Sequence, residues 1–185
     1  MIARVLKNIY YSYRLKKKIK KIQNIGDNND LSKDIIIYYP ERVSIGSNIY
    51  IGPNAEINGL GEVEIRSGVI IGPNLVIHSA NHNYKDAKYL PYDETFVFKK
   101  VVINENVWIG GNVIITPGSI IGEGCIIGAG CVVSGNIPPL SIVVGNPCRV
   151  IKSRDKEHYY RLKEQGYIYL KYKKEKKLQP KINKI

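Results

Sequence analysis

The sequence predicts an all-β solenoid, a parallel β-helix with a helix at each end and one long loop excursion. Aliphatic residues recur every six positions, and glycine often follows them directly. This period fits neither the 3.6 residues per turn of an α-helix nor the two-residue alternation of a hairpin sheet. A six-residue unit is one short strand plus one corner, and three such units make one coil.

The repeat is clearest from Val101 to Lys152. Six aliphatic positions follow one another six residues apart, namely Ile103, Ile109, Ile115, Ile121, Ile127 and Val133. Gly110, Gly122 and Gly128 each follow one of these positions, where the missing Cβ relieves crowding near a corner. We therefore expect the aliphatic side chains to point into a common core and the polar positions to face water.

An earlier block carries the same repeat. Its aliphatic positions are Ile45, Ile51, Ile57, Ile65, Ile71 and Ile77. The step from Ile57 to Ile65 is longer than the others, which predicts an insertion at a corner near Gly59–Gly61. Pro53 and Pro73 stand at expected corners, where no N–H is needed for a strand ladder. The two blocks predict about four coils in a β-helix domain over residues 31–152.

Both ends of the chain are basic. The 185 residues are 44% hydrophobic, enough for one domain with a core, and the net charge is +12. Residues 1–21 hold 8 Lys and Arg and no acid, whereas residues 149–185 hold 13 Lys and Arg and 4 acids. The body between them is mildly acidic. We expect no nucleic acid partner, because no recognition motif accompanies the charge.

Residues 1–30 are predicted to form a basic amphipathic helix followed by a turn-rich linker. The apolar positions at helical spacing are Ile2, Val5, Leu6, Ile9, Tyr10 and Tyr13. The linker is the run from Asn24 to Asn29. One interpretation is a helix that packs on the solenoid and caps its open end. The alternative is a helix that lies on anionic lipid or a lipid-linked glycan at the inner membrane face.

Two further segments do not follow the repeat. Residues 83–100 interrupt it, and a long excursion from a compact solenoid is usually functional. Tyr84 and Tyr92 in this segment are candidates for substrate binding through sugar rings, although they equally suit contact with a neighbouring subunit or with the solenoid itself. Residues 153–185 are predicted to be a helix, over 154–177, and a frayed tail.

The three cysteines and three histidines limit the chemistry. Cys125 and Cys131 hold inward repeat positions, which predicts small buried side chains, and an odd number of cysteines favours a reduced, cytoplasmic protein without a signal peptide. His82 stands at the mouth of the excursion, where an imidazole can take a proton from an attacking hydroxyl. His78 and His158 do not complete a zinc site with it, so no metal is expected.

Four stretches resemble the galactoside/maltose O-acetyltransferase group of hexapeptide-repeat acyltransferases. They are SANH, NVWIGGNVIITPGSIIGEGCIIGAGCVV, NIPPLSIVVGNPCRVIK and DKEHYY, and the resemblance covers residues 43–160. It implies a left-handed coil, although parallel crossovers are generally right-handed. It also implies a homotrimer with each active site between two solenoids, acetyl-CoA as acyl donor, and His82 as catalytic base.

The resemblance also implies an acetyl-CoA site. Its residues here are Trp108, Gly110, Gly111, Ala129, Ser134, Arg149 and Lys152. Trp108 flanks the acetyl and pantetheine end, and the Gly111 N–H is aimed at the thioester carbonyl, where it stabilises the oxyanion. Ala129 and Ser134 line the pantetheine channel. Arg149 and Lys152 stand near the nucleotide phosphates, where fixed positive charge is apt.

The acceptor side departs from the group. A basic helix replaces a compact helical segment, and an acceptor-binding asparagine of the group falls on Gly52, although Asn54 lies close by and is our candidate. These departures favour a surface glycan or its precursor, such as lipopolysaccharide or capsule, as acceptor. The predicted function is an acetyl-CoA-dependent sugar O-acetyltransferase. The alternatives are an aminosugar N-acetyltransferase and a catalytically silent trimeric scaffold.

Overall fold

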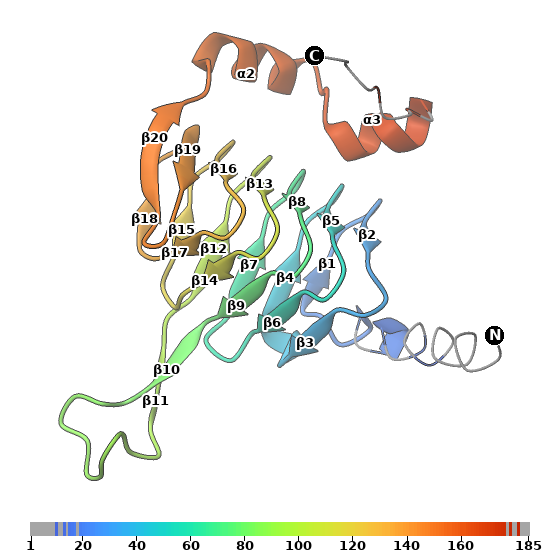
Figure 1. The fold of residues 1–185 in the computed structure, drawn as a ribbon. Helices are drawn as coiled ribbons and strands as arrows, with labels where there is room; N and C mark the ends of the chain where they lie inside the picture. The colour runs from blue at the N-terminus through green and yellow to red at the C-terminus, as the bar shows by residue number, and fades with distance from the viewer. Residues whose placement is uncertain are drawn as a thin grey trace.

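The computed structural model describes residues 10, 13, 15–17, 19–176, 178 and 181. The body is a three-sided parallel solenoid (Figure 1), which we divide into faces A, B and C. Face A holds β1 (Asn24–Ile25), β4 (Val43–Ile45), β7 (Val63–Ile65), β12 (Val101–Ile103), β15 (Ile120–Ile121) and β18 (Asn136–Ile137). Face B holds β2 (Asp30–Leu31), β5 (Tyr50–Ile51), β8 (Ile70–Ile71), β13 (Trp108–Ile109), β16 (Ile126–Ile127), β19 (Ser141–Val144) and the antiparallel β20 (Arg149–Ser153). Face C holds β3 (Ile36–Tyr38), β6 (Glu56–Asn58), β9 (Val76–His78), β14 (Ile114–Ile115) and β17 (Val132–Val133).

The predicted left-handed β-helix is confirmed, and its aliphatic repeat forms the core. On face A, Ile45 pairs with Ile65, Ile65 with Ile103, and Ile103 with Ile121. All four side chains are buried, as are their counterparts on the other two faces. The coil is longer in the N-terminal half, because a corner carries extra residues between β6 and β7 and a short 3-10 helix, η1 (Pro40–Arg42), occupies the equivalent corner one coil earlier.

The solenoid begins at Asn24, earlier than the expected boundary at residue 31. The asparagine-rich run that we interpreted as a linker is a corner of the first coil. Asn28 and Asn48 both have positive φ, of 60° and 59°, and their side chains are hydrogen-bonded to each other. Asn29 accepts a hydrogen bond from the Ile49 N–H at 2.9 Å. Asparagines are common in linkers, but here they form a tight corner between two strands of the solenoid.

The described residues of the N-terminal segment are helical up to Ile19. Leu15 and Ile19 pack against the end of the core, which is the contact that a capping helix would make. Residues 1–9, which include the predicted apolar positions Ile2, Val5, Leu6 and Ile9, lie outside the described residues. Within the described part of the chain, no helix is both long enough and apolar enough to cross a bilayer.

The C-terminal region contains two helices where we expected one. They are α2 (Lys156–Glu164) and α3 (Tyr169–Lys176), and Ser153 still belongs to β20. The side chain of Asp155 accepts a hydrogen bond from the His158 N–H at 2.8 Å and caps the start of α2. Gly166 follows α2 with a φ of 69°, which ends the helix in the left-handed conformation that glycine adopts most easily.

The predicted loop excursion is an antiparallel arm. Its strands are β10 (Ala80–His82) and β11 (Phe96–Phe98), so that His82 belongs to the first strand of the arm and pairs with Phe96. The arm leaves the solenoid between β9 on face C and β12 on face A, and Figure 1 shows it projecting away from the coils, on a different side from α2 and α3. Leu90 in the arm is 97% exposed.

Candidate active site

His82 is held in the arm by aromatic rings. Its imidazole lies face to face with the ring of Tyr92, with 3.8 Å between the ring centroids and 18° between the planes. The Phe96 ring, on the paired strand, lies 4.5 Å away and is tilted by 38°. Rings at these separations attract each other beyond the area that they bury. The arm therefore positions the imidazole through stacking.

Among the residues that the structure describes, no carboxylate is hydrogen-bonded to His82 Nδ1. His82 Nδ1 is buried and has no hydrogen-bond partner among the described residues. Asp93 and Glu94, the nearest candidates in the arm, are engaged elsewhere. Asp93 accepts hydrogen bonds from Asn83 Nδ2 and from the Thr95 N–H, both at 2.9 Å, and Glu94 is paired with Lys88.

Asp93 instead shapes the arm. Its carboxylate is 6% exposed and ties the two sides of the arm together through Asn83 and Thr95. The hydrogen bond from the Thr95 N–H lowers the pKa of Asp93 below its ordinary value, and the one from the Asn83 side chain acts in the same direction. These contacts fold the chain back so that Tyr92 meets His82.

A second set of predicted residues lies at the corner between faces B and C. Because Ile51, Ile71, Ile109 and Ile127 are in register, the residues two positions later form a column of Pro53, Pro73, Gly111 and Ala129. Proline has no N–H, so only the last two members of the column offer a backbone donor. The Gly111 N–H has no acceptor among the described residues, while its carbonyl accepts from the Gly130 N–H at 2.9 Å.

Trp108 and Gly110 flank this corner in the same coil. Trp108 points outward from β13 and is 56% exposed. Packing requires glycine at position 110, because a Cβ there would lie 2.7 Å from the backbone nitrogen of Ala129. The corner thus offers an exposed indole and an unpaired N–H close together.

Asn54 lies in an asparagine ladder at the same corner. Asn54 Nδ2 donates to Asn74 Oδ1 at 3.2 Å, and Asn74 Nδ2 donates to Asn112 Oδ1 at 2.9 Å. All three have φ near 58°, which asparagine tolerates better than most residues. Each of these asparagines stands three residues after a buried isoleucine of the repeat, which was the signal for this ladder, and the ladder uses the amide that we expected to bind an acceptor.

The remaining predicted site residues are exposed. Ala129 and Ser134 lie at corners on either side of β17 on face C, and Arg149 and Lys152 lie in β20 at the end of face B. Tyr84 is in the arm and is 69% exposed. Within the described residues, no group of three or more His, Cys, Asp or Glu side chains is arranged to hold a metal ion.

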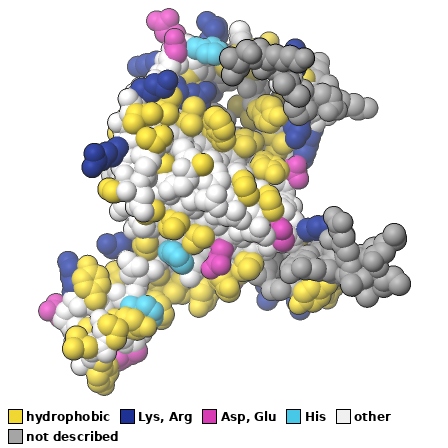
Figure 2. Space-filling view, in the orientation of Figure 1, with side chains coloured by type: hydrophobic (Ala, Val, Ile, Leu, Met, Phe, Trp, Pro, Cys, Tyr) yellow, Lys and Arg dark blue, Asp and Glu magenta, His cyan; other side chains and the backbone are white. Residues whose placement is uncertain are grey.

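One chain does not bring the two sets together. His82, Tyr84 and Tyr92 belong to the arm, which leaves between faces C and A, whereas Trp108 points out from face B. Hydrophobic side chains gather on the arm and also over the front of the solenoid (Figure 2). Within one copy, His82 therefore lies in an arm that leaves at the corner between faces C and A, whereas Gly111 lies at the corner between faces B and C.

Comparison with known proteins identifies the repeat. The family described as Bacterial transferase hexapeptide (six repeats) matches residues 100–135. A maltose O-acetyltransferase from Clostridium difficile is 32% identical, with 77% of this chain and 75% of that chain covered and a TM-score of 0.66. A galactoside acetyltransferase in complex with coenzyme A is 27% identical over 83% of this chain and 82% of that chain, with a TM-score of 0.71.

The similarity also reaches enzymes that acylate amines. A mutant of AntD, an N-acyltransferase from Bacillus cereus in complex with dTDP and coenzyme A, is 25% identical, covers 82% of this chain and 95% of that chain, and has a TM-score of 0.61. No protein of curated function matches the sequence significantly. The shared features are the solenoid and acyl transfer, while the acceptors differ.

Proposed function

Because the chain belongs to the hexapeptide-repeat acyltransferases of the galactoside and maltose O-acetyltransferase group, we propose that it transfers the acetyl group of acetyl-CoA to a sugar hydroxyl. The proposed acceptor is a surface glycan or its precursor. The proposed base is His82, and the proposed donor site is the corner that contains Trp108 and Gly111. The protein supplies positioning, a hydrogen-bond donor and a proton acceptor.

The observation that carries this proposal is the N–H of Gly111, which has no acceptor within the described part of the chain. Attack on a thioester places negative charge on the carbonyl oxygen, and a fixed backbone donor is well suited to receive it. Losing one such donor typically costs about 3 kcal/mol of transition-state stabilisation. The two preceding coils have proline at the same corner, so they have no N–H to offer. The Trp108 coil is therefore the first after these two proline coils to have a backbone donor at this corner.

His82 completes the reaction. The acceptor hydroxyl attacks the thioester carbonyl while His82 Nε2 accepts its proton. The new C–O bond forms as the C–S bond breaks, and the proton passes from the imidazole to the departing CoA sulfur. Transfer is direct, because the buried Cys125 and Cys131 are unsuited to act as nucleophiles. Burial raises the pKa of both thiols, which disfavours the thiolate.

The assembly that we propose is a homotrimer with three inter-subunit sites. His82 on the arm of one copy would face Trp108 on face B of the next copy and Gly111 at the adjoining corner between its faces B and C. Closed three-fold packing gives each arm a neighbouring face and leaves no arm unpaired. The apolar exposed side chains of the arm, Leu90 above all, then become buried against another subunit.

We further propose that the exposed cations near the two ends of the chain bind anionic groups. Arg149 and Lys152 in β20 would contact the nucleotide phosphates, and Ala129 and Ser134 would line the path of the pantetheine. The excess of Lys and Arg near both termini supports peripheral association with anionic lipid, as a lipid-linked glycan acceptor would require. Binding to vesicles that contain anionic lipid, and loss of that binding at high salt, would test this part.

The function is tested by release of free thiol from acetyl-CoA with a panel of hydroxyl and amino sugars. We expect acceptor-dependent release by the wild-type protein and loss of it in His82→Ala, with His158→Ala as the control. Equal rates in His82→Ala and wild type would remove the base assignment. A product that survives mild alkali would exclude an ester and identify an amide, which is the N-acetyltransferase alternative.

A further inference from the structure

A cavity of about 510 Å³ lies between face B and the C-terminal helices. Its floor consists of the outward side chains of three successive strands, Ile70, Trp108 and Ile126, and its roof includes Leu162 and Tyr167. A cavity of this volume is within the range of small-molecule sites. Its other solenoid residues, Gly68, Asn106 and Val107, lie at the corner between faces A and B, so Trp108 is the lining residue that links the cavity to the Gly111 corner at which we place the thioester.

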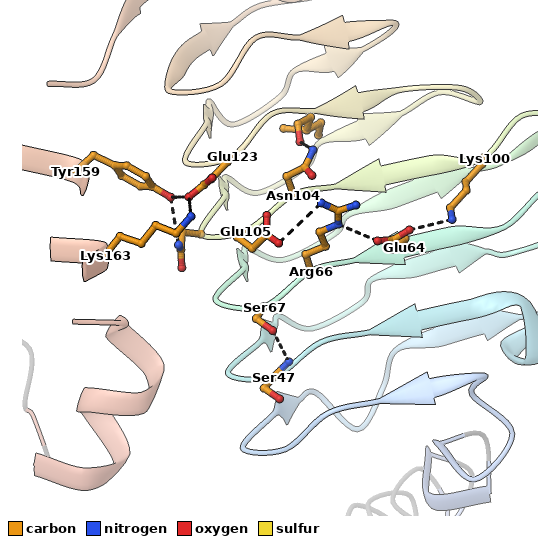
Figure 3. A network of polar contacts seen from close by, with 12 residues as sticks. Ser47, Glu64, Arg66, Ser67, Lys100, Asn104, Glu105, Glu123, Tyr159 and Lys163 are labelled. Carbon is orange, nitrogen blue, oxygen red and sulfur yellow. Dashed lines mark hydrogen bonds and ion pairs between the residues drawn. The ribbon is translucent and has the colours of Figure 1, made fainter. Parts of the chain in front are cut away.

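The roof of the cavity is held in place by a polar network. Tyr159 and Lys163 of α2 both donate to Glu123 Oε1 in the solenoid, and Asn106 Nδ2 donates to the Tyr159 hydroxyl at 3.1 Å (Figure 3). Arg154 donates to the Gly124 carbonyl at 3.0 Å and lies over the Tyr159 ring. The cavity is therefore preformed in the folded chain.

The same network determines what the cavity can bind. Asn106, Arg154, Tyr159 and Lys163 all line it, and each makes a side-chain hydrogen bond to another part of the protein. The other lining residues present aliphatic and aromatic surface for the most part. A sugar would lose hydration of its hydroxyls there and gain few matching partners. An alkyl chain needs no such partners and gains from leaving water.

The position of the cavity indicates which alkyl chain it would hold. Gly111 follows Trp108 by three residues, a span of at most about 10 Å of extended chain. The cavity is on the Trp108 side of that corner, whereas Ala129 and Ser134, our candidates for the pantetheine, flank face C. A thioester with its carbonyl oxygen at the Gly111 N–H could therefore direct its acyl carbons across Trp108 into the cavity.

We propose that this cavity is an acyl-chain site and that the enzyme accepts acyl-CoA donors longer than acetyl-CoA. This inference rests on the proposed function for its chemistry, which is unchanged. The acyl carbonyl leaves the CoA sulfur for the acceptor oxygen, and the hydroxyl proton passes through His82 to the sulfur. Each buried methylene should strengthen donor binding about four-fold until the cavity is full.

The test is equilibrium binding of acetyl-, butyryl- and hexanoyl-CoA to the full-length protein by calorimetry. We expect affinity to rise along the series for the wild type. Leu162→Trp, which fills the cavity, should abolish the rise and leave acetyl-CoA binding unchanged. The control is Ile120→Trp, which places the same side chain on face A, away from the cavity. Its affinities should follow the wild type.

Three outcomes would overturn the acyl-chain site. They are affinity that is flat or falls with chain length in the wild type, an undiminished rise in Leu162→Trp, and conversion of an oligomeric wild type to monomers by Leu162→Trp. The last result would mean that a second copy fills the cavity. Binding is measured without an acceptor, so it is independent of thiol release. Normal acyl-CoA binding without any thiol release would sink the proposed function and leave the acyl site standing.

Discussion

The imidazole of His82 and the ring of Tyr92 lie face to face, with 3.8 Å between their centroids, although ten positions separate them in the chain. The contact exists because β10 and β11 pair and the arm turns back on itself. We expected Tyr92 to bind substrate. The stack indicates instead that its ring positions the His82 imidazole. Several expected outcomes depend on such pairs of residues.

The first prediction concerns Tyr92 itself. Replacing it with leucine removes the stack, and an aromatic pair is worth about 0.5–1.5 kcal/mol, so kcat should fall roughly 2- to 10-fold. Tyr92→Phe should keep near wild-type kcat, because the ring remains. Steady-state kinetics with saturating donor measures both. A raised acceptor KM with unchanged kcat in both variants would instead return Tyr92 to substrate binding.

The second prediction separates the N–H of Gly111 from its small size. Gly111→Pro removes the donor by giving this coil the residue that Pro53 and Pro73 already supply in the two preceding coils. We expect kcat to fall about 100- to 1,000-fold, the effect of removing an oxyanion donor. Gly111→Ala keeps the N–H, and the nearest atoms to its Cβ would be in the Pro73 ring at 3.3 Å and the Pro73 carbonyl oxygen at 3.4 Å. It should lose far less activity, and equal losses in the two variants would argue against an oxyanion donor.

The third prediction tests whether one site needs two copies. His82→Ala and Gly111→Pro should each be inactive alone. If a site takes His82 from one subunit and Gly111 from the next, random mixed trimers at equal amounts should recover about a quarter of the wild-type sites. Co-expression of the two variants followed by a thiol-release assay measures this. Activity that stays at the level of the single variants would place both residues in sites within one chain.

The fourth prediction is the pH dependence of the arm. The folded state lowers the pKa of Asp93 below its ordinary value of 3.8, mainly through the hydrogen bond from the Thr95 N–H. A lowered pKa means that the contribution of Asp93 to stability is complete above that ordinary value and is lost as the pH falls through the lower, folded-state value. Asp93→Asn should remove this dependence.

Nuclear magnetic resonance between pH 5 and 2 measures that effect through the ring-current shift of the His82 protons over Tyr92. We expect the shift to collapse in acid in the wild type, while the solenoid amides, as an internal control, keep their positions. In Asp93→Asn the ring-current shift of the His82 protons should stay constant between pH 5 and 2. An unchanged titration in this variant would mean that another group controls the arm.

The solenoid could be predicted from the sequence alone, whereas the roles expected of Trp108, Gly111 and Ala129 came from resemblance to a known family. Each strand-and-corner unit is local, so burial of one aliphatic side chain per unit appears as a six-residue period that needs no long-range information. For the same reason, the column of Pro53, Pro73, Gly111 and Ala129 can be read from spacing alone once the register is known. The Asn54 ladder follows from the same register, although the arm makes its two steps unequal, at 20 and 38 residues.

Only the tertiary structure decided the arm, the C-terminal roof and the separation of the two sets of site residues. The arm strands have three residues each, too few to leave a period, so the contact of His82 with Tyr92 and Phe96 depends on how the chain folds back. The cavity depends on Glu123 meeting Tyr159 and Lys163, which are far away in sequence. Contacts of this kind form between segments that the coil brings together, and no local pattern records them.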